Sequence, residues 1–420
     1  MGVVMSFKFG VSSVLSAIAV CSLLSSPANS AGTENPYDNG YLSGDWNGRR
    51  IELLNSGIDT EIVSTMDLVR VMSGLKTGNS FIANIDARMG FDGAKVYGIE
   101  GNTSNIHIIS VTGASPNATR LGSVEGISSI EANINGFKIY EAWTEQRFGK
   151  GDQMSLLIGL RDLNNDFLTM EMTDNFMKPT MQLMPTIANS GRAGASGYPN
   201  TSLAARLKYE PSSMAYLQVA AFDGVPGNPN HPRGTHISLG AGDGSMLIAE
   251  AGFTPRVKGQ EDRTPNKLAV GYWRYSAQRP DLAVPARREI NQGVYLLSSY
   301  EFFGDNQGRT VGAFFKTGLA DKHTHQVDWD YQVGLVANGL IPSRINSEIG
   351  IGFTNAENSD DYKAANPTAD NRESSFNAYY RDELIPGVMV QPEYQYIVNP
   401  GSVVTTKTTS VAGVRVEMNF

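Results

Sequence analysis

Polar and apolar residues alternate in short segments along most of this chain, and the last eleven residues show the pattern most clearly. In SVAGVRVEMNF (410–420), apolar side chains recur at every second position up to Phe420, and Arg415 and Glu417 fall between them. Side chains on a β-strand point to opposite faces with a period of two, so the segment predicts a strand with one apolar and one polar face. The apolar face needs either a protein core or lipid against it.

The same alternation recurs in segments of about ten residues that are separated by turn-forming residues. We expect strands at 58–71, 81–91, 105–111, 138–148, 153–161, 204–210, 214–222, 245–253, 267–275, 293–303, 311–318, 329–337, 347–354, 374–382, 388–398 and 410–420. Alternating segments of this length are typical of transmembrane β-barrels. The pattern therefore predicts an all-β fold, a transmembrane antiparallel β-barrel of about sixteen strands.

The connections between these segments alternate in length. Short links such as GKGD, EPSS, GDNQGR and LIPG alternate with long ones near 113–136, 163–201, 223–243, 277–290 and 355–372. Short periplasmic turns and long outer loops are expected of bacterial outer-membrane barrels. An even strand number puts both chain ends on the periplasmic side, where Phe420 can close the barrel against the first strand.

The third outer loop, 163–201, is the longest connection. Loops of this length in a compact protein are usually functional. A barrel of this size encloses an aqueous channel, so we expect the loop to fold inward and set the aperture. A loop exposed at the outer surface is the alternative.

The first thirty residues have the composition of an export signal. Lys8 is followed by an apolar run from about residue 11 to 24 and then by small residues, with no acidic residue in the segment. The run is short for a membrane-spanning helix of ~20 residues. We expect a signal peptide (1–30), an N-terminal segment with a short helix (31–57) and the barrel (58–420). Cys21 is the only cysteine, so the mature chain would hold no disulfide and no cysteine metal site.

Charge and chemistry exclude other function classes. A net charge of -8 argues against nucleic acid as a partner. The five histidines are scattered, and HTH (323–325) has no clear third metal ligand. The sequence contains no recognisable catalytic constellation, and we expect no cofactor and no metal. An enzyme or adhesin built on a barrel remains the alternative from another class.

A stretch that does not alternate, LSGDWNGRRIELLNSGID (42–59), predicts a short helix with Asp45 as N-cap and Gly57 as terminator. It resembles the GDWGG-x-R-x-x-L-x-x-x-GI motif of the carbohydrate-selective porins of the OprB type, with Asn47 in place of the first glycine of the pair. Further blocks in the same order resemble that family: IYEAWTEQRF (139–148), ARLKYEP (205–211), VAAFDGVPG (219–227), MLIAEAGF (246–253) and VQPEYQYIVNPG (390–401).

This resemblance implies a porin for passive diffusion of monosaccharides and small oligosaccharides across the outer membrane of a Gram-negative cell. A general diffusion porin with little preference for sugars is the alternative within transport. The implied partners are outer-membrane lipid, sugar solutes and the barrel-assembly machinery, the last through Phe420. Monomer and homotrimer both remain open.

Face assignment gives the candidate lumen residues. In 138–148, Glu141, Trp143 and Glu145 share one face with Ile139 and Arg147, whereas Tyr140, Ala142 and Thr144 share the other. Carboxylates facing lipid are costly, so the charged face should line the lumen. The Trp143 ring offers a flat surface for a pyranose, and the neighbouring carboxylates can accept hydroxyl hydrogen bonds. Packing of Trp143 under the inward loop is an equal alternative.

The same reasoning on other strands adds further lumen candidates. These are Arg161, Arg206, Lys208, Glu250, Trp273 and Gln395. Arg192, with Lys178, should be the loop charge nearest the constriction. We expect Glu141 and Glu145 to face Arg161, Arg206 and Lys208 across the water, as an acidic and a basic wall, although a structural ladder of charges is the alternative for each residue.

Overall fold

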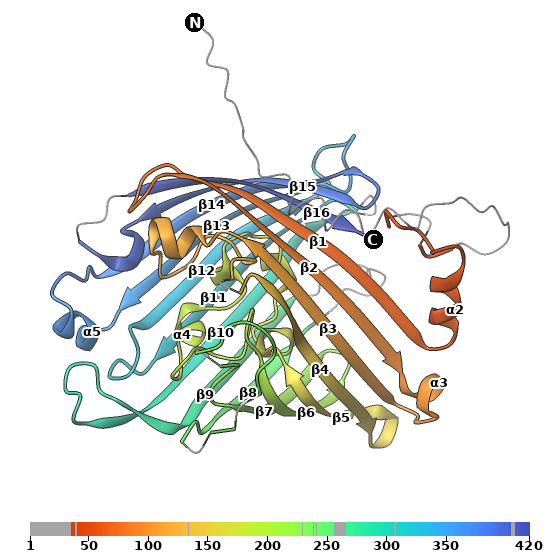
Figure 1. The fold of residues 1–420 in the computed structure, drawn as a ribbon, viewed down its shortest axis with the longest axis horizontal. Helices are drawn as coiled ribbons and strands as arrows, with labels where there is room; N and C mark the ends of the chain where they lie inside the picture. Colours follow the sequence, from red (N-terminus) through yellow and green to blue (C-terminus); the bar gives the residue numbers. More distant parts are fainter. Residues whose placement is uncertain are drawn as a thin grey trace, which may run out of the picture.

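The chain forms one closed antiparallel barrel in a computed structural model (Figure 1). The structure describes residues 35–37, 40–132, 134–228, 230–237, 239–240, 242–255, 266–305, 308–404 and 408–420. The predicted signal peptide (1–30) lies outside the described residues. Within the described part of the chain, no helix is long and apolar enough to cross a membrane.

Sixteen strands among the described residues make the wall, each paired with its neighbours in sequence. They are β1 (Ile58–Val71), β2 (Gly78–Asp92), β3 (Asn102–Gly113), β4 (Gly136–Phe148), β5 (Met154–Arg161), β6 (Ser202–Ser212), β7 (Ala215–Asp223), β8 (Ser245–Phe253), β9 (Lys267–Pro280), β10 (Arg288–Gly304), β11 (Thr310–Ala320), β12 (Val327–Asn338), β13 (Glu348–Asn358), β14 (Arg372–Ile385), β15 (Val388–Val398) and β16 (Thr409–Asn419). The predicted all-β barrel of sixteen strands is confirmed.

The barrel closes between its first and last strands. Strand β16 pairs with β1 in a register that places Arg415 opposite Asp67. The backbone N–H of Phe420 donates to the carbonyl of Ile62 at 2.8 Å. A closed sheet leaves no unpaired edge, which is the condition for crossing lipid with strands.

The outer face of the wall is apolar at every second position. Leu156, Ile158, Leu207, Leu217 and Val219 are each more than a third exposed on consecutive strands. Their neighbours in sequence point inward and are buried. This is the outward apolar band that a lipid environment requires.

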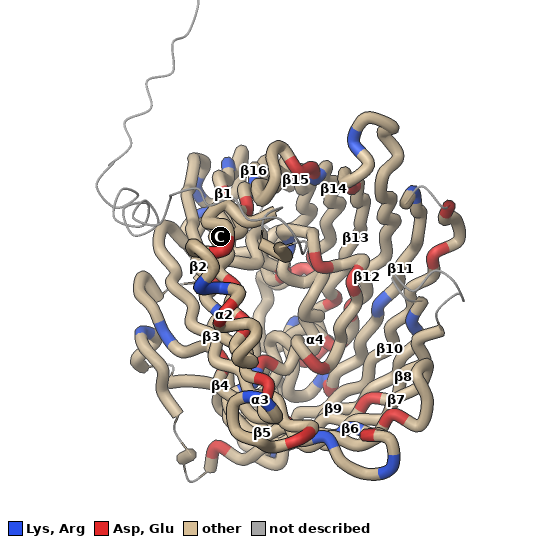
Figure 2. Tube along the Cα trace, turned by 90° about the vertical axis from the view of Figure 1, so that its right-hand side faces the viewer, with Lys and Arg blue, Asp and Glu red and all other residues tan. Residues whose placement is uncertain are grey.

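Short helices lie at the two ends of the barrel. In Figure 1, α2 (Arg49–Asn55) and α3 (Gly93–Tyr97) lie at one end, and α5 (Asp360–Ala365) lies at the other. The end with α2 and α3 carries the C-terminus and the turns that connect one hairpin to the next. We take it as the periplasmic end. Figure 2 views the molecule from this end and shows α2 and α3 over one side of the opening.

Helix α2 begins differently from the sequence expectation. Gly48, in the left-handed region at φ 86°, occupies the N-cap position, and no side chain caps the helix. Asp45 instead accepts a hydrogen bond from Asn35 at 2.9 Å, and its carbonyl accepts from the N–H of Arg50. Gly57 follows the helix at φ 90°, where its lack of a Cβ permits the left-handed turn.

Two outer loops fold into the barrel. Loop L3 (162–201) carries three 3₁₀ turns and α4 (Pro185–Ala188) and packs against the inner faces of β6 to β14. Loop L2 (114–135) also packs inward, through Leu121 and Ile127 on one side and Ile130 and Ile134 on the other. An inward position of L2 was not expected from the sequence. The predicted long loop at 277–290 is wrong, because β9 and β10 extend and leave only 281–287 between them.

Candidate functional site

The interior of the barrel is divided by L3. Apolar side chains of the loop are almost completely buried against inward-facing residues of the wall; they include Leu163, Phe167, Leu168, Met170, Phe176, Met181, Met184 and Ile187. On the wall, Phe222, Ile248, Trp273, Leu297 and Phe314 complete this core. Burial of this apolar surface holds the loop inside the barrel rather than at its rim.

Polar side chains of the wall form hydrogen bonds with backbone groups of L3. Lys316 on β11 is fully buried and donates to the carbonyls of Met181 at 2.9 Å and Gln182 at 2.8 Å. Glu250 on β8 accepts from the N–H of Leu168 at 3.0 Å. A buried backbone group without a partner would be costly, so these side chains fix where the loop lies.

A ladder of ion pairs joins three strands to the start of L3. Arg161 at the end of β5 donates through Nε to Asp166 of L3 at 2.8 Å and contacts Glu141 on β4 at 3.2 Å. Arg206 on β6 donates to the same Asp166 at 2.7 Å and to Glu145 on β4. Each arginine therefore bridges β4 to the loop, and the carboxylate of Asp166 lies between the two guanidinium groups.

This arrangement corrects the expected acidic and basic walls. Glu141 and Glu145 do not face Arg161 and Arg206 across water, because β4, β5 and β6 are consecutive strands whose side chains pair directly. The structure instead has the alternative arrangement, a ladder of ion pairs between neighbouring strands. Lys208 is part of the same wall and pairs with Glu210 at 2.9 Å.

Strand β4 also departs from strict alternation. A register shift opposite His107 and Ile108 of β3 places both Tyr140 and Glu141 on the inner side, and Ile139 is 42% exposed on the outside. The predicted faces of Ile139 and Tyr140 are therefore wrong, since a bulge adds one residue to the strand. The Tyr140 hydroxyl donates to Asp162, the first residue of L3, and burial raises the pKa of Asp162 to about 7.

Trp143 lies on the inner side with its ring beneath a cation. The guanidinium carbon of Arg161 is 4.9 Å from the centre of the ring. One face of the indole is thus occupied by a side chain, in the geometry of a cation–π contact. Trp143 does not line the cavity described next.

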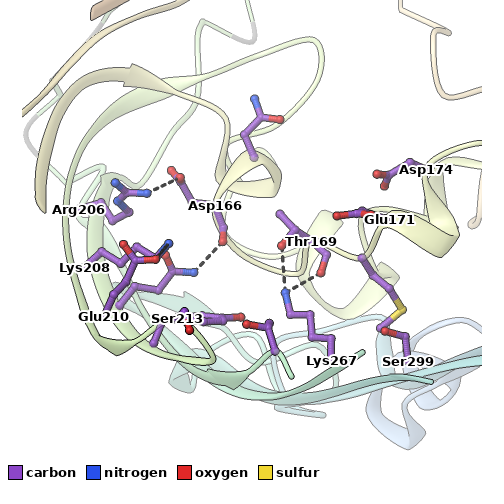
Figure 3. Close-up of a pocket in the computed structure, with 15 residues that line it drawn as sticks. Asp166, Thr169, Glu171, Asp174, Arg206, Lys208, Glu210, Ser213, Lys267 and Ser299 are labelled. Carbon is purple, nitrogen blue, oxygen red and sulfur yellow. Dashed lines mark hydrogen bonds and ion pairs between the residues drawn. The ribbon is translucent and has the colours of Figure 1, made fainter. Parts of the chain in front are cut away.

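A cavity of about 390 Å³ lies between L3 and the wall (Figure 3). Arg206, Lys208 and Glu210 line one side, and Thr169, Glu171 and Asp174 of L3 line another. Ser213 and Thr254, which follow β6 and β8, also line it, so the cavity lies on the periplasmic side of L3. Its volume falls within the range of small-molecule sites.

The polar groups of this cavity are held in place. Lys267 at the start of β9 donates to the carbonyl of Thr169 at 2.6 Å and to its hydroxyl at 2.9 Å. Gln218 on β7 donates to the carbonyl of Asp166 at 2.6 Å. Dashed lines in Figure 3 mark these contacts beside the pair of Arg206 and Asp166.

Tyr216 is the one aromatic residue among the described residues that line the cavity, and the sequence reasoning missed it. Its hydroxyl donates to Glu250 at 2.6 Å, and Lys208 and Lys267 lie 5.5 and 5.6 Å from its ring centre. The ring lies across Gly252, the cross-strand partner on β8, where an added Cβ would come within 2.2 Å of it. The alternation of Leu217, Val219 and Ala221 on β7 would have placed Tyr216 and Gln218 inside.

Asp174 and Glu171 place negative charge on the loop side of the cavity. Asp174 is exposed to the cavity, and the protein around the cavity still desolvates its carboxyl group. This desolvation raises the pKa of Asp174 to about 7, partly offset by Lys316. Its charge therefore changes near neutral pH.

The remaining residues that were predicted to line the lumen do not line this cavity. Trp273 and Glu250 are buried beneath L3, and Gln395 donates to the carbonyl of Ile127 in L2 at 2.9 Å. Arg192 is not at the cavity; it pairs with Asp243 at 3.1 Å and its side chain is 66% exposed. Lys178 is also not at the cavity, because it is fully buried in an ion pair with Glu125 of L2.

Comparisons with known proteins agree with this architecture. Porin B of Pseudomonas aeruginosa is 22% identical over 94% of this chain and 95% of its own, and a putative porin, QuiX, of Acinetobacter baylyi is 22% identical over 91% and 94%. The high-pH structure of Pseudomonas putida OprB superposes with a TM-score of 0.82 at 19% identity, covering 92% of this chain and all of that one. The model of the OprB family of carbohydrate-selective porins matches residues 83–420. The chain therefore belongs to the OprB family of carbohydrate-selective porins, and it is a sugar-selective diffusion channel of the outer membrane.

Proposed function

We propose that monosaccharides and small oligosaccharides pass the narrowest part of this channel through the cavity between L3 and strands β6 to β9. The observation that carries this proposal is the lining: charged and amide groups, several of them paired with one another, surround the ring of Tyr216, the one aromatic ring among the described residues that line the cavity. A sugar offers hydroxyl groups that donate and accept, and one apolar face. Both kinds of surface have counterparts in this cavity.

The ion-pair ladder positions the donors of the cavity. Glu145 and Asp166 hold Arg206, so its guanidinium is oriented before a solute arrives. Trp143, Glu141 and Arg161 act one step further back, by fixing Asp166 and the start of L3. Preorganised groups lose little entropy on contact, which favours selectivity among solutes over tight binding.

Binding at the cavity is weak because a channel must also release its solute. We expect sugar dissociation constants in the millimolar range, about 4 kcal/mol. Hydrogen bonds from the wall replace those that a sugar loses to water at a narrow point. A solute of similar size without hydroxyl groups gains no such replacement.

The test is sugar flux through reconstituted Tyr216→Ala. We expect this substitution to lower the rate of glucose entry into liposomes by about fivefold, since an aromatic contact contributes about 1 kcal/mol. Entry of a size-matched non-sugar solute should change little. Tyr272→Ala is the matched control, because Tyr272 lies on β9 with its side chain on the outer face.

Equal slowing of glucose and of the non-sugar solute by Tyr216→Ala would overturn the proposal. The protein would then be a general diffusion channel in which Tyr216 only shapes the pore. Unchanged entry of both solutes would place sugar selectivity at another point of the channel.

We further propose that residues 1–30 are an export signal removed from the mature chain, leaving an N-terminal segment (31–57) before the barrel. Pairing of the Phe420 backbone with β1 supports a role for this residue in barrel assembly. The N-terminal sequence of the protein purified from outer membranes tests the first point. Cross-linking in membranes distinguishes a monomer from a homotrimer.

A further inference from the structure

Three outer loops lie at the end of the barrel opposite α2 (Figure 1), and one side chain from each of them takes part in a single cluster. His323 lies in L6 (321–326), Asp281 in L5 (281–287) and Asp361 in L7 (359–371). The His323 Nδ1 atom is 2.6 Å from Asp361 Oδ2 and 3.5 Å from Asp281 Oδ2. One ligand atom from each residue lies within 4.8 Å of the other two.

The backbone holds these loops together around the cluster. The N–H of Leu282 in L5 donates to the carbonyl of His323 at 2.7 Å. Ser359 in L7 donates through its N–H to the carbonyl of Gln326 at 2.7 Å and through its hydroxyl to that of His325 at 2.8 Å. The three loops are therefore fixed to one another close to the side chains in question.

The Asp281 carboxylate has one oxygen satisfied and one directed at the cluster. Its Oδ1 accepts from the N–H groups of Ala283 and Val284 at 2.8 and 3.0 Å. Its Oδ2 has no hydrogen bond to any described residue; it faces His323, with Arg287 at 3.9 Å. The side chain is only 2% exposed. Oδ1 therefore fixes the carboxylate in place, and Oδ2 remains able to accept a ligand bond on the side of His323.

We propose that Asp281, His323 and Asp361 bind a divalent transition-metal ion such as Zn²⁺. The bound ion joins L5, L6 and L7 at the outer mouth of the channel. One imidazole nitrogen and two carboxylate oxygens form a ligand set that Zn²⁺ accepts, with water in a fourth position. Calcium and magnesium prefer oxygen ligands alone, so the histidine favours Zn²⁺ over both.

The geometry is close to that of a tetrahedral site. Ligands about 2.1 Å from a zinc ion lie about 3.4 Å apart. The separation of 3.5 Å between Asp281 and His323 matches this value, whereas Asp361 at 2.6 Å must move away by less than 1 Å. Asp361 is 20% exposed and lies on the short helix α5, which leaves its side chain room to turn.

The cationic side chains near the cluster also pair with other carboxylates, so they do not fully balance the negative charge of Asp281 and Asp361. Arg287 contacts Asp281 at 3.9 Å but also pairs through Nε with Glu289. Lys363 pairs with Asp360 at 3.0 Å. His325 belongs to the same loop but is 1% exposed, with its ring 6.4 Å from that of Trp273, and is not a ligand.

The test measures Zn²⁺ binding to untagged protein purified from outer membranes in detergent and stripped with EDTA. We expect one Zn²⁺ per chain by calorimetry, and His323→Gln and Asp361→Asn should each weaken binding by about tenfold or more. The control is the double variant His231→Gln, His236→Gln. These two rings lie 5.9 Å apart in another outer loop, so the variant tests whether neighbouring histidines away from the cluster account for the binding.

A second readout checks the cross-link between the loops. Zn²⁺ should raise the temperature at which the compact barrel unfolds in the wild type and in the control variant, but not in His323→Gln. Retained heat-modifiable migration shows that each variant folds. The proposal is overturned by the absence of stoichiometric Zn²⁺ binding, by binding that survives His323→Gln, or by binding lost in the control variant.

Discussion

Among the residues that line the cavity, Asp174 is one whose charge responds to pH near neutrality. Because desolvation raises its pKa to about 7, the carboxyl group is largely neutral at pH 5.5 and ionised at pH 8.5. Ionisation adds a negative charge to the cavity wall, so we expect the preference for cations to increase as the pH rises through 7. Reversal potentials across planar bilayers in a salt gradient measure this preference.

The Asp174→Asn variant should lack that pH-dependent step. Asp152→Asn serves as its control, since Asp152 lies in the exposed turn between β4 and β5. If wild type and Asp174→Asn follow the same pH curve, the titrating group is another residue.

At the residue scale, sequence alternation predicted many of the side chains that point inward, although not Tyr140 beside the bulge of β4, and it did not predict what they contact. Arg161, Arg206 and Lys208 lie on the inner side of the wall, as expected where the neighbours in sequence have to face lipid. Asp166 was missed, since it lies in a loop where no periodicity applies. A partner contributed by a loop cannot be inferred from the pattern of a strand.

At the element scale, aromatic side chains on the inner wall lie over glycines of adjacent strands. Tyr295 is directly opposite Gly271, Tyr379 opposite Gly350 and Trp273 opposite Gly293. A Cβ at each of these glycines would come within 2.7 Å of the aromatic ring or closer. The glycines therefore let large rings lie flat against the wall, which leaves room for L3 in the barrel.

Lys316 anchors L3 to the wall, and its removal tests what the loop does. Lys316→Met keeps the length of the side chain but leaves the buried carbonyls of Met181 and Gln182 without a donor, at a cost of about 1–3 kcal/mol. We expect lower thermal stability and a larger, noisier single-channel conductance as the loop loosens. Lys150→Met is the control, because Lys150 lies in an exposed periplasmic turn.

Lower stability of Lys316→Met without any change in conductance would show that L3 does not set the aperture.

The strands themselves were predictable because each has to present an apolar face to lipid. The inward path of L2 was not, because its isoleucines at 127, 130 and 134 follow no strand period and meet the wall only in the folded barrel.

At the scale of the whole molecule, the inside of the barrel has a core of its own. L2 packs near β1 to β4 and β14 to β16, and L3 packs against much of the remaining wall. Inward-facing residues are thus polar where water or a partner side chain meets them and apolar where a loop covers them. This explains why the inner face of several strands carries residues such as Phe314 and Leu297 that alternation alone would assign to lipid.

The seam of the barrel depends on Arg50 of helix α2. Arg50 is 1% exposed and donates to the carbonyl of Phe420 at 3.0 Å and to the carbonyl of Thr60. Its guanidinium group also lies over the rings of Tyr37 at 4.1 Å, Tyr41 at 4.4 Å and Trp46 at 5.1 Å. One side chain therefore ties the N-terminal segment to both strands that close the sheet.

Arg50→Met should weaken closure while keeping most of the volume of the side chain. The carbonyl groups of Phe420 and Thr60 lose a charged donor and the three rings lose a cation, so we expect the folded state to lose about 1–3 kcal/mol. The temperature at which the compact form converts to the slower-migrating unfolded form should fall. Arg49→Met is the control, because Arg49 is the preceding residue in the same helix and is exposed. If both variants convert at the same temperature as the wild type, α2 only lies beside the seam and contributes nothing to its stability.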